Sequence, residues 1–497
     1  MQQIFNPFDQ YTGSDRLGTP RFLLLLVGLI LLSGWITSLI GIVAGFGFLV
    51  LPFVFVYLYL LFKHPILGLY TAIVFGFVLL GIGRYLRGVQ VGLAMDGILY
   101  LTFIALIFNK FHEKVDWSAA KKDITLLSAI WFAYSLFEIV NPEARSFEAW
   151  FSGRGVGLYM MMMVPLTLLF IDTNKKLDTF FLIWAIMSLL VTLKGLMQLT
   201  YGVDPFEKMW LDDGNAKTHI LFGKLRIFSF LSDAGQFGAN QAYSAVVATI
   251  VALAQKNRKT KLFYAIVAVL AFYGMIISGT RGAISIPMAG FMAYFVLRKN
   301  VKIMIAGFLL LIAIFVFFKY TTIGQDNPQI RRMRTAFDPN DASLQVRINN
   351  QIILKNYLST RPFGGGIGHG GVKAQRYLPN AFLSQIATDS WYVLIWVEQG
   401  IVGLLLHLFI LFYVVIKSSY MIVFRIRDPD LKLKMSALTA GMFGVMVASY
   451  GNAVLGQMPT SMLIYSSMAL MLNTEQFDVP LPKKLTDTPA IDIEPIR

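Results

Sequence analysis

The chain has 497 residues, of which 56% are hydrophobic and only 14% are charged. Soluble globular domains carry roughly 25% charged residues, so this composition excludes that class. The net charge of +15 would suggest nucleic acid in a soluble protein, but in a membrane protein the position of each charge matters more. The absence of cysteine excludes disulfides, thiolate nucleophiles and cysteine metal sites.

Apolar runs long enough to cross a bilayer recur along most of the chain. A hydrocarbon core about 30 Å thick needs roughly 20 apolar residues per helix, and unbroken runs argue against the alternating pattern of a β-barrel. We therefore predict an all-α polytopic membrane helix bundle whose first run is an anchor and not a cleaved signal. Its spans, about 14 in number, are expected near 22–40, 42–62, 66–83, 89–108, 124–140, 155–171, 179–200, 236–254, 262–278, 282–297, 301–318, 391–416, 436–455 and 459–473.

The basic residues in short connections give the expected orientation. With the N-terminus in the cytoplasm, the connections around Lys63, Lys122, Lys176, Arg298 and Arg425 all fall on the cytoplasmic side. This is the bias that the positive-inside rule describes, so both termini are predicted to be cytoplasmic.

The opposite, periplasmic side carries the long connections, near 141–154, 201–235 and 320–390. We expect 1–319 to hold about 11 spans, 320–390 to be a large periplasmic loop with short helices, and 391–473 to hold about three spans. Residues 474–497 are predicted to be a cytoplasmic tail, too short for a nucleotide-binding domain. Within the large loop, 343–358 is compatible with a helix and 364–371 is rich in glycine.

Cations on the periplasmic side run against the topological bias and point to an anionic ligand. Arginine suits phosphate because its planar fork stays charged and donates two parallel hydrogen bonds. Arg281 stands out because it lies in a break between two apolar runs, at the membrane boundary. Arg226 precedes the span at 236, and Arg347 lies on the predicted loop helix. For the other periplasmic cations, Arg84 and Arg332 among them, snorkelling or loop solvation is the simpler interpretation.

Metal and cofactor chemistry is not expected. No cluster of His, Asp and Glu with ligand spacing occurs on the periplasmic side, so we predict no metal and no cofactor. His369, in the glycine-rich segment, is a candidate base, although a lone loop histidine is more often a surface residue. Lys194 is a cation near the outer end of its span, which snorkelling would also explain.

Five segments, in this order along the chain, resemble the O-antigen ligase and O-antigen polymerase superfamily of bacterial envelope glycosyltransferases. They are RIFSFLSDAGQFGAN at 226–240, SGTRGAI at 278–284, DASLQVR at 341–347, RPFGGGIGH at 361–369 and DSWYVLIWVEQGIVGL at 389–404. The resemblance covers roughly 220–415, and the first half is similar only in hydropathy. It implies inverting, metal-independent transfer of a glycan from an undecaprenyl-pyrophosphate donor to a sugar hydroxyl at the periplasmic face of the bacterial inner membrane.

The resemblance also distributes roles over the candidate residues. Arg281, Arg347 and Arg226 would stabilise the pyrophosphate, with Arg154 a weaker partner and Lys194 a further candidate. The histidine of the ligase motif is absent, and Asp389 stands near its place, as in polymerase members. Asp389 or His369 would be the base, and we favour Asp389, which also suits an N-cap of the span at 391. Glu398 is expected to orient an arginine or a loop, and Tyr392 to belong to an interfacial belt or to bind sugar.

Polymerisation of O-antigen, capsule or exopolysaccharide repeats is the first hypothesis for the function. The ligase alternative transfers finished polymer to lipid A-core or another acceptor. A secondary transporter is a third reading, although no second broken span matches the break at 278–284. The expected partners are the lipid-linked glycan donor, a glycan or lipid A-core acceptor and membrane lipids, with a chain-length regulator as a further candidate and no nucleic acid.

Overall fold

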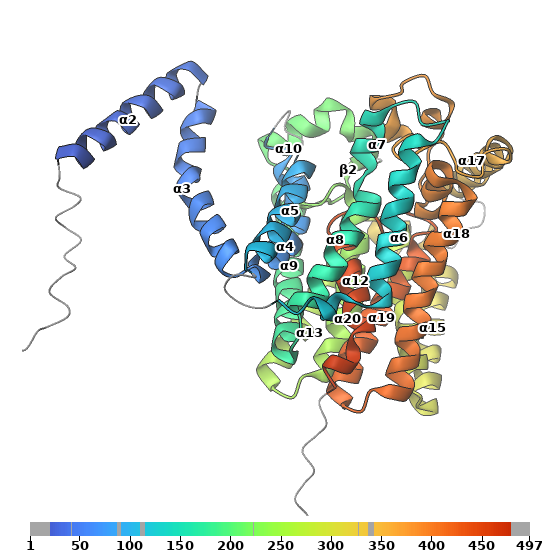
Figure 1. Ribbon diagram of the computed structural model, residues 1–497. Helices are drawn as coiled ribbons and strands as arrows, with labels where there is room; N and C mark the ends of the chain where they lie inside the picture. The colour runs from blue at the N-terminus through green and yellow to red at the C-terminus, as the bar shows by residue number, and fades with distance from the viewer. Residues whose placement is uncertain are drawn as a thin grey trace, which may run out of the picture. The chain divides into compact units, whose positions relative to one another are not determined.

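Figure 1 shows the protein as a computed structural model, which describes residues 20–40, 42–86, 91–109, 115–221, 223–326, 328–335 and 342–478. The predicted cytoplasmic lysines Lys110 and Lys114, Asp341 of the DASLQVR motif and residues 479–497 of the predicted tail lie outside the described residues. The chain forms two compact units, Met1–Leu67 and Gly68–Arg497.

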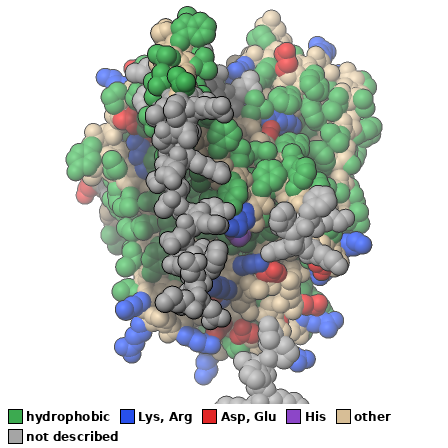
Figure 2. Space-filling model, turned by 60° about the vertical axis from the view of Figure 1, so that its left-hand side comes forward, with side chains coloured by type: hydrophobic (Ala, Val, Ile, Leu, Met, Phe, Trp, Pro, Cys, Tyr) green, Lys and Arg blue, Asp and Glu red, His purple; other side chains and the backbone are tan. Residues whose placement is uncertain are grey.

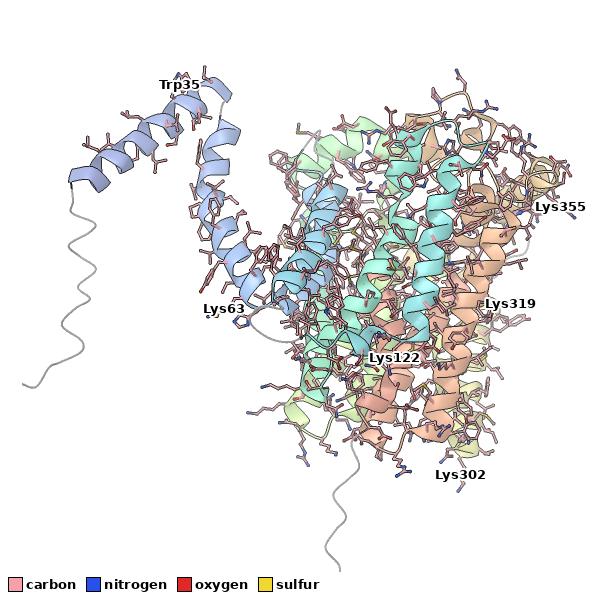
Figure 3. All side chains as sticks on the ribbon, viewed as in Figure 1. Trp35, Lys63, Lys122, Lys302, Lys319 and Lys355 are labelled. Carbon is pink, nitrogen blue, oxygen red and sulfur yellow. The ribbon has the colours of Figure 1, made fainter. Side chains whose placement is uncertain are left out.

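The first unit contains a pair of helices, α2 (Pro20–Ile40) and α3 (Ile42–Lys63), which pack against each other. Large apolar side chains are exposed along both, for example Trp35 at 63% and Phe53 at 71%. Figure 3 labels Trp35 on α2 and Lys63 at the end of α3. A helix that is apolar on all sides and lacks a polar face is typical of a membrane span.

The second unit is a helix bundle. After α4 (Ile66–Ile82) its helices are α5 (Gly92–Asn109), α6 (Asp123–Phe137), α7 (Phe147–Gly153), α8 (Gly155–Phe170), α9 (Asn174–Tyr201), α10 (Pro205–Trp210), α11 (Ala216–His219), α12 (Ala234–Ala254), α13 (Arg258–Ile277), α14 (Ser285–Leu297), α15 (Val301–Tyr320), α16 (Pro328–Arg334), α17 (Ala342–Leu358), α18 (Trp391–Tyr420), α19 (Pro429–Ala448) and α20 (Thr460–Leu472). Short turns of helix are η1 (Trp117–Ala120), η2 (Glu138–Val140), η3 (Leu211–Asn215), η4 (Arg281–Ile284), η6 (Val372–Arg376), η7 (Phe382–Gln385), η8 (Met421–Arg425) and η9 (Thr474–Gln476), and β1 (Ile220–Leu221) pairs antiparallel with β2 (Lys224–Leu225).

The prediction of an all-α polytopic membrane bundle is confirmed. Eight helices of the described chain are long and apolar enough to cross a membrane, and six shorter apolar helices accompany them. On the face in Figure 2, hydrophobic side chains cover the middle of the molecule and Lys and Arg side chains gather toward its lower edge. In Figure 3, Lys302 and Lys319 mark the two ends of α15, and Lys355 lies on α17, higher in the view.

Helix α12 forms the centre of the bundle, in contact with α13, α14 and α19. Asp233 is its N-cap, because the carboxylate accepts a hydrogen bond of 2.9 Å from the backbone N–H of Gln236. Gln236 and Asn240 are buried in its first turns, and Gln236 Nε2 donates to Thr460 Oγ1 of α20 at 2.7 Å. The first turns of α12 therefore carry buried polar groups, which join this helix to α20.

Two predicted spans need correction. The span predicted at 436–455 is α19, which begins at Pro429 because Asp428 caps it and proline suits the first helical turn. The run at 391–416 is not one continuous helix, because Gly400 has a φ of 67° and breaks α18. Trp391 Nε1 donates to His407 Nε2 at 2.9 Å, whereas a straight helix would separate residues 16 apart by about 24 Å. The part of α18 before Gly400 is thus folded back on the part after it.

The glycine-rich segment completes the backbone hydrogen bonds at this break. Gly365 and Gly366 donate their N–H groups to the carbonyls of Val397 and Glu398, at 2.8 and 2.9 Å. After the break, Val402 donates to the carbonyl of Pro362 at 3.3 Å. A broken helix in a membrane protein needs such partners, since an unpaired backbone group in an apolar environment is costly.

Candidate functional site

The break between α13 and α14 places Arg281 beside the start of α12. Gly279 has a φ of 59°, which L side chains rarely adopt, and ends α13 sharply. Thr280 Oγ1 then donates to the carbonyl of Ala234 at 2.7 Å, which ties the break to α12. Arg281 opens η4, and its Nη1 donates to Thr335 Oγ1 at 3.0 Å, at the end of α16.

Arg226 reaches the same place from the loop before α12. Its Nη2 donates to Thr280 Oγ1 at 3.2 Å and its Nη1 to the carbonyl of Thr218 at 3.2 Å. Its Nε is buried without an acceptor among the described residues. Burial lowers the pKa of Arg226 from its usual value; the charge of Asp233 opposes that shift and the charge of Arg281 adds to it.

A third arginine, Arg332 of α16, completes the group. Its Cδ lies 3.4 Å from the position that a Cβ would take on Gly279, so the Arg332 side chain packs close to this glycine. Its Nε is also buried without an acceptor among the described residues. Burial and the neighbouring charges of Arg226 and Arg281 lower the pKa of Arg332 to about 10. We call Arg226, Arg281 and Arg332 the arginine triad; it is a cluster of mutually repelling cations that an anion would stabilise.

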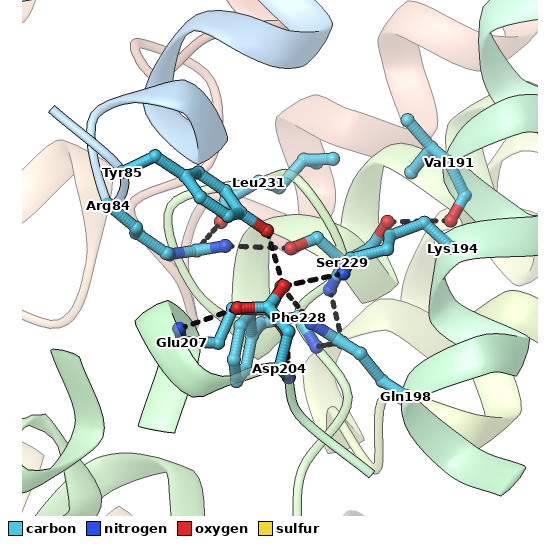
Figure 4. A network of polar contacts seen from close by, with 10 residues as sticks. All are labelled: Arg84, Tyr85, Val191, Lys194, Gln198, Asp204, Glu207, Phe228, Ser229 and Leu231. Atoms are coloured by element: carbon cyan, nitrogen blue, oxygen red, sulfur yellow. Dashed lines mark hydrogen bonds and ion pairs between the residues drawn. The ribbon is translucent and has the colours of Figure 1, made fainter. Parts of the chain in front are cut away.

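A network of buried polar groups holds the loop that carries Arg226 (Figure 4). Arg84 donates to the carbonyls of Ser229, at 2.7 Å, and Leu231, with its guanidinium 4.4 Å from the centre of the Phe228 ring. Gln198 Oε1 accepts from the backbone N–H of Ser229 at 2.8 Å. The sequence does not single out Arg84, because its burial depends on a loop that lies 145 residues further along the chain.

Lys194 belongs to this network. Its Nζ lies 3.2 Å from both Asp204 Oδ2 and Glu207 Oε1. Glu207 is 1% exposed and also accepts from Gln198 Nε2 at 2.8 Å. Two carboxylates therefore neutralise Lys194, and its contacts place it in the scaffold beneath the Arg226 loop.

Arg347 and Asp389, both selected from the sequence, form an ion pair. Arg347 Nε lies 3.2 Å from Asp389 Oδ2, and the Asp389 side chain is 54% exposed. Asn350, one turn further along α17, donates to the carbonyl of Ala387 at 3.3 Å. The N-cap of α18 is Ser390 and not Asp389, since Ser390 Oγ accepts from the N–H of Val393. The Asp389 carboxylate is therefore accessible for chemistry.

The loop between α19 and α20 connects the ion pair with the triad. Arg347 Nη1 lies 3.9 Å from the position that a Cβ would take on Gly451. The next residue, Asn452, packs directly on Gly282: a Cβ added to Gly282 would lie 2.0 Å from Asn452 Nδ2. Gly282 directly follows Arg281. The adjacent loop residues Gly451 and Asn452 therefore border the Arg347–Asp389 ion pair and the arginine triad, respectively.

His369 is buried, and both of its ring nitrogens are engaged. Its Nε2 accepts from the backbone N–H groups of Arg145, at 2.9 Å, and Ser146, at 3.2 Å, so its Nδ1 donates to the carbonyl of Ile367 at 3.0 Å. Burial, followed by the charge of Arg145, lowers the pKa of His369, although its contacts with Ile367 and Gly366 oppose the shift. The arrangement leaves no nitrogen lone pair for a substrate proton and ties the glycine-rich segment to the start of α7.

The remaining candidates have structural contacts. Glu398 is 5% exposed, and its Cγ lies 3.1 Å from the position of a Cβ on Gly370, in the glycine-rich segment. Tyr392 donates to the carbonyl of Met446 at 2.7 Å. Arg154 is paired with Asp96 of α5, and no contact among the described residues joins it to the triad. In the described part of the chain, no group of three His, Asp or Glu side chains is placed to hold a metal ion.

These features define the class of protein: a polytopic membrane protein with a cationic cluster beside an exposed carboxylate. Residues 266–408 match the family described as O-antigen ligase. A curated O-antigen polymerase of Salmonella muenchen is 22% identical over 330 residues, which are 64% of this chain and 80% of that protein. Both matches support the resemblance to the O-antigen ligase and polymerase superfamily that the motifs indicate. Arg281, Arg332, Arg347 and Asp389 lie inside the matched segment, and Arg226 lies before it.

Proposed function

We propose that this protein is a glycosyltransferase that polymerises lipid-linked polysaccharide repeats at the periplasmic face of the bacterial inner membrane. The observation that carries the proposal is the arginine triad, linked through Gly282, Asn452 and Gly451 to the Arg347–Asp389 ion pair. An anion-binding cluster beside an accessible carboxylate suits a reaction that expels an anion and removes a proton.

The triad would hold the pyrophosphate of an undecaprenyl-pyrophosphate donor. As the bond between the anomeric carbon and the pyrophosphate oxygen breaks, negative charge grows on that oxygen. Fixed guanidinium groups in a partly dry site stabilise such charge, and they need no metal ion to do so. Burial of Arg226 and Arg332 strengthens the effect, because water screens them less.

Asp389 would accept the proton of the attacking hydroxyl. The acceptor oxygen forms a bond to the anomeric carbon from the side opposite the leaving group, and undecaprenyl pyrophosphate departs with its electron pair. A single displacement of this kind inverts the anomeric configuration. Asp389 is favoured over His369 because the ring nitrogens of His369 are engaged in the described structure.

Ligation is the second candidate, and the description of the matched family favours it. The polymerase match and the Asp at position 389 favour polymerisation. The donor chemistry is the same, and the two functions differ only in the acceptor. Neither match supports the transporter alternative.

The test uses purified full-length protein, EDTA and undecaprenyl-pyrophosphate-linked repeat units of the host polysaccharide. A ladder of lengthening lipid-linked chains, lost in Arg281→Ala, supports the polymerase. Transfer only after lipid A-core is added identifies a ligase instead. Absence of transfer under both conditions, with flux of a solute in proteoliposomes, would overturn the proposal.

A further inference from the structure

The loop between α19 and α20, residues 449–459, lies outside the segment matched by the family, yet it borders the reaction centre. The backbone N–H of Trp391 donates to the carbonyl of Ser449 at 2.9 Å, and Ser390 Oγ donates to the same carbonyl at 3.3 Å. Asp389 directly precedes these two residues. The start of the loop is therefore held beside the ion pair by hydrogen bonds.

The far end of the loop is fixed to the start of α12. Ser232 Oγ donates to Gln457 Oε1 at 3.1 Å, and Gln236 Nε2 donates to the carbonyl of Gln457 at 3.1 Å. Between these ends, Gly451 lies near Arg347 and Asn452 packs on Gly282, so the loop borders both the ion pair and the arginine triad. Its backbone is built to present side chains there.

Tyr450 is the aromatic residue that this loop leaves exposed. Its side chain is 63% exposed, and no hydrogen bond or ring contact engages it among the described residues. The two aromatic residues at the start of α18 are occupied: Trp391 is buried on His407, and Tyr392 donates to Met446. Tyr450 follows Ser449, which accepts from the N–H of Trp391, and precedes Gly451, where an added Cβ would lie 3.9 Å from Arg347 Nη1.

We propose that Tyr450 binds the acceptor glycan by stacking on a sugar ring next to the attacking hydroxyl. This inference rests on the proposed function and names the part of the site that recognises the acceptor. A pyranose presents a face of C–H groups, and an aromatic ring with a polar tip covers that face while its hydroxyl stays in water. The acceptor oxygen must come within about 3 Å of the base, so the ring that carries it has to lie beside Asp389.

The alternative is an interfacial aromatic that contacts lipid headgroups. That role predicts no effect on acceptor binding, so one kinetic experiment separates the two. The acceptor is the repeat unit as an alkyl glycoside, which lacks a pyrophosphate and can serve only as acceptor. The donor is the labelled lipid-linked repeat, and the concentration of each is varied separately with purified full-length protein.

The variants are Tyr450→Ala, Tyr450→Phe and, as a matched control, Tyr201→Ala, which changes another tyrosine that is 89% exposed. Tyr450→Ala is expected to raise the acceptor KM about tenfold and leave the donor KM unchanged, because stacking is lost. Tyr450→Phe keeps the ring and is expected to stay within about twofold of wild type. If Tyr450→Ala is not recovered from membranes, Tyr450→Leu removes the ring but keeps an apolar side chain.

An unchanged acceptor KM in the variants without a ring would overturn the inference, as would an equal rise in Tyr201→Ala. A donor KM that rises in parallel with the acceptor KM would overturn it too, since it indicates general damage to the site. Absence of transfer by the wild-type protein would instead refute the proposed function on which the inference rests.

Discussion

Arg347 Nε lies 3.2 Å from Asp389 Oδ2 and joins α17 to the residue that precedes the N-cap of α18. The two residues are 42 positions apart in the chain. The carboxylate uses one oxygen for this contact and remains half exposed, and Arg347 Nη1 lies 3.9 Å from the position that a Cβ would take on Gly451. This geometry fits the proposed roles, in which Asp389 is the base and Arg347 orients it.

The first prediction concerns Asp389. Asp389→Asn keeps the shape of the side chain but cannot accept a proton, so transfer is expected to fall about 10²- to 10⁴-fold. Initial rates with purified protein and lipid-linked donor measure this loss. Asp212→Asn, at an exposed aspartate outside the site, is the control and should be normal. A rate for Asp389→Asn within about threefold of wild type would contradict the role of base, because loss of a general base is expected to lower the rate at least about 100-fold.

A second prediction separates two adjacent arginines of α16. Arg332 is half-buried beside Arg226 and Arg281, whereas Arg331 is exposed. Arg332→Ala is expected to weaken donor binding about ten- to a hundredfold, because one charge-assisted contact to the pyrophosphate is lost. Arg331→Ala should leave the donor KM unchanged. Equal donor KM values for the two variants would exclude Arg332 from the site.

The sequence predicts the membrane helices because each apolar run by itself indicates a span. Predicted spans coincide with helices because a chain in a bilayer must satisfy its backbone hydrogen bonds locally. The break at Gly400 has no such signal, since glycine is common in membrane helices. The distant glycine-rich segment stabilises the break, because its N–H groups donate hydrogen bonds to the carbonyls of Val397 and Glu398.

The candidate residues came from different signals in the sequence. Arg281 was selected because charge at a membrane boundary is unusual, and that argument needs no tertiary structure. Arg226 and Arg347 were selected as periplasmic arginines, before a span and on a loop helix, and Asp389 was selected from the family resemblance. Arg332 was missed because its segment is highly basic and is expected to be solvated, whereas its contact with Gly279 is visible only in the tertiary structure. Conversely, His369 looks reactive as a sequence, but the amides of Arg145 and Ser146 occupy its free nitrogen.

The third prediction tests the break in α18. Gly400 has a φ of 67°, and a Cβ there would lie 1.9 Å from the carbonyl oxygen of Pro362. Gly400→Ala therefore combines a strained backbone, which costs about 1–3 kcal/mol, with a clash against backbone atoms. We expect little folded protein in membranes and a lower melting temperature in detergent. Gly97→Ala, where no atom lies within 4 Å, is the control and should fold normally.

The fourth prediction concerns pH and His369. Burial lowers the pKa of His369 in the folded protein below its value in the unfolded chain, which is about 6.5. Between these two pKa values, the unfolded chain binds more protons than the folded chain. The contribution of His369 to stability is therefore complete above the unfolded value and declines as the pH falls below it. The charge of Arg145 adds to the shift.

The melting temperature of the purified wild-type protein should accordingly drop between pH 7 and pH 5, and His369→Gln should reduce that drop. The side-chain carbonyl oxygen of glutamine can still accept from the amides of Arg145 and Ser146, but glutamine does not titrate. The same variant is expected to retain most transfer activity, because the proposed base is Asp389. His369→Ala, which removes the acceptor, should lower stability at both pH values. If His369→Gln abolishes transfer while its melting temperature at pH 7 equals that of wild type, the histidine takes part in the reaction and the assignment of Asp389 as the base is wrong.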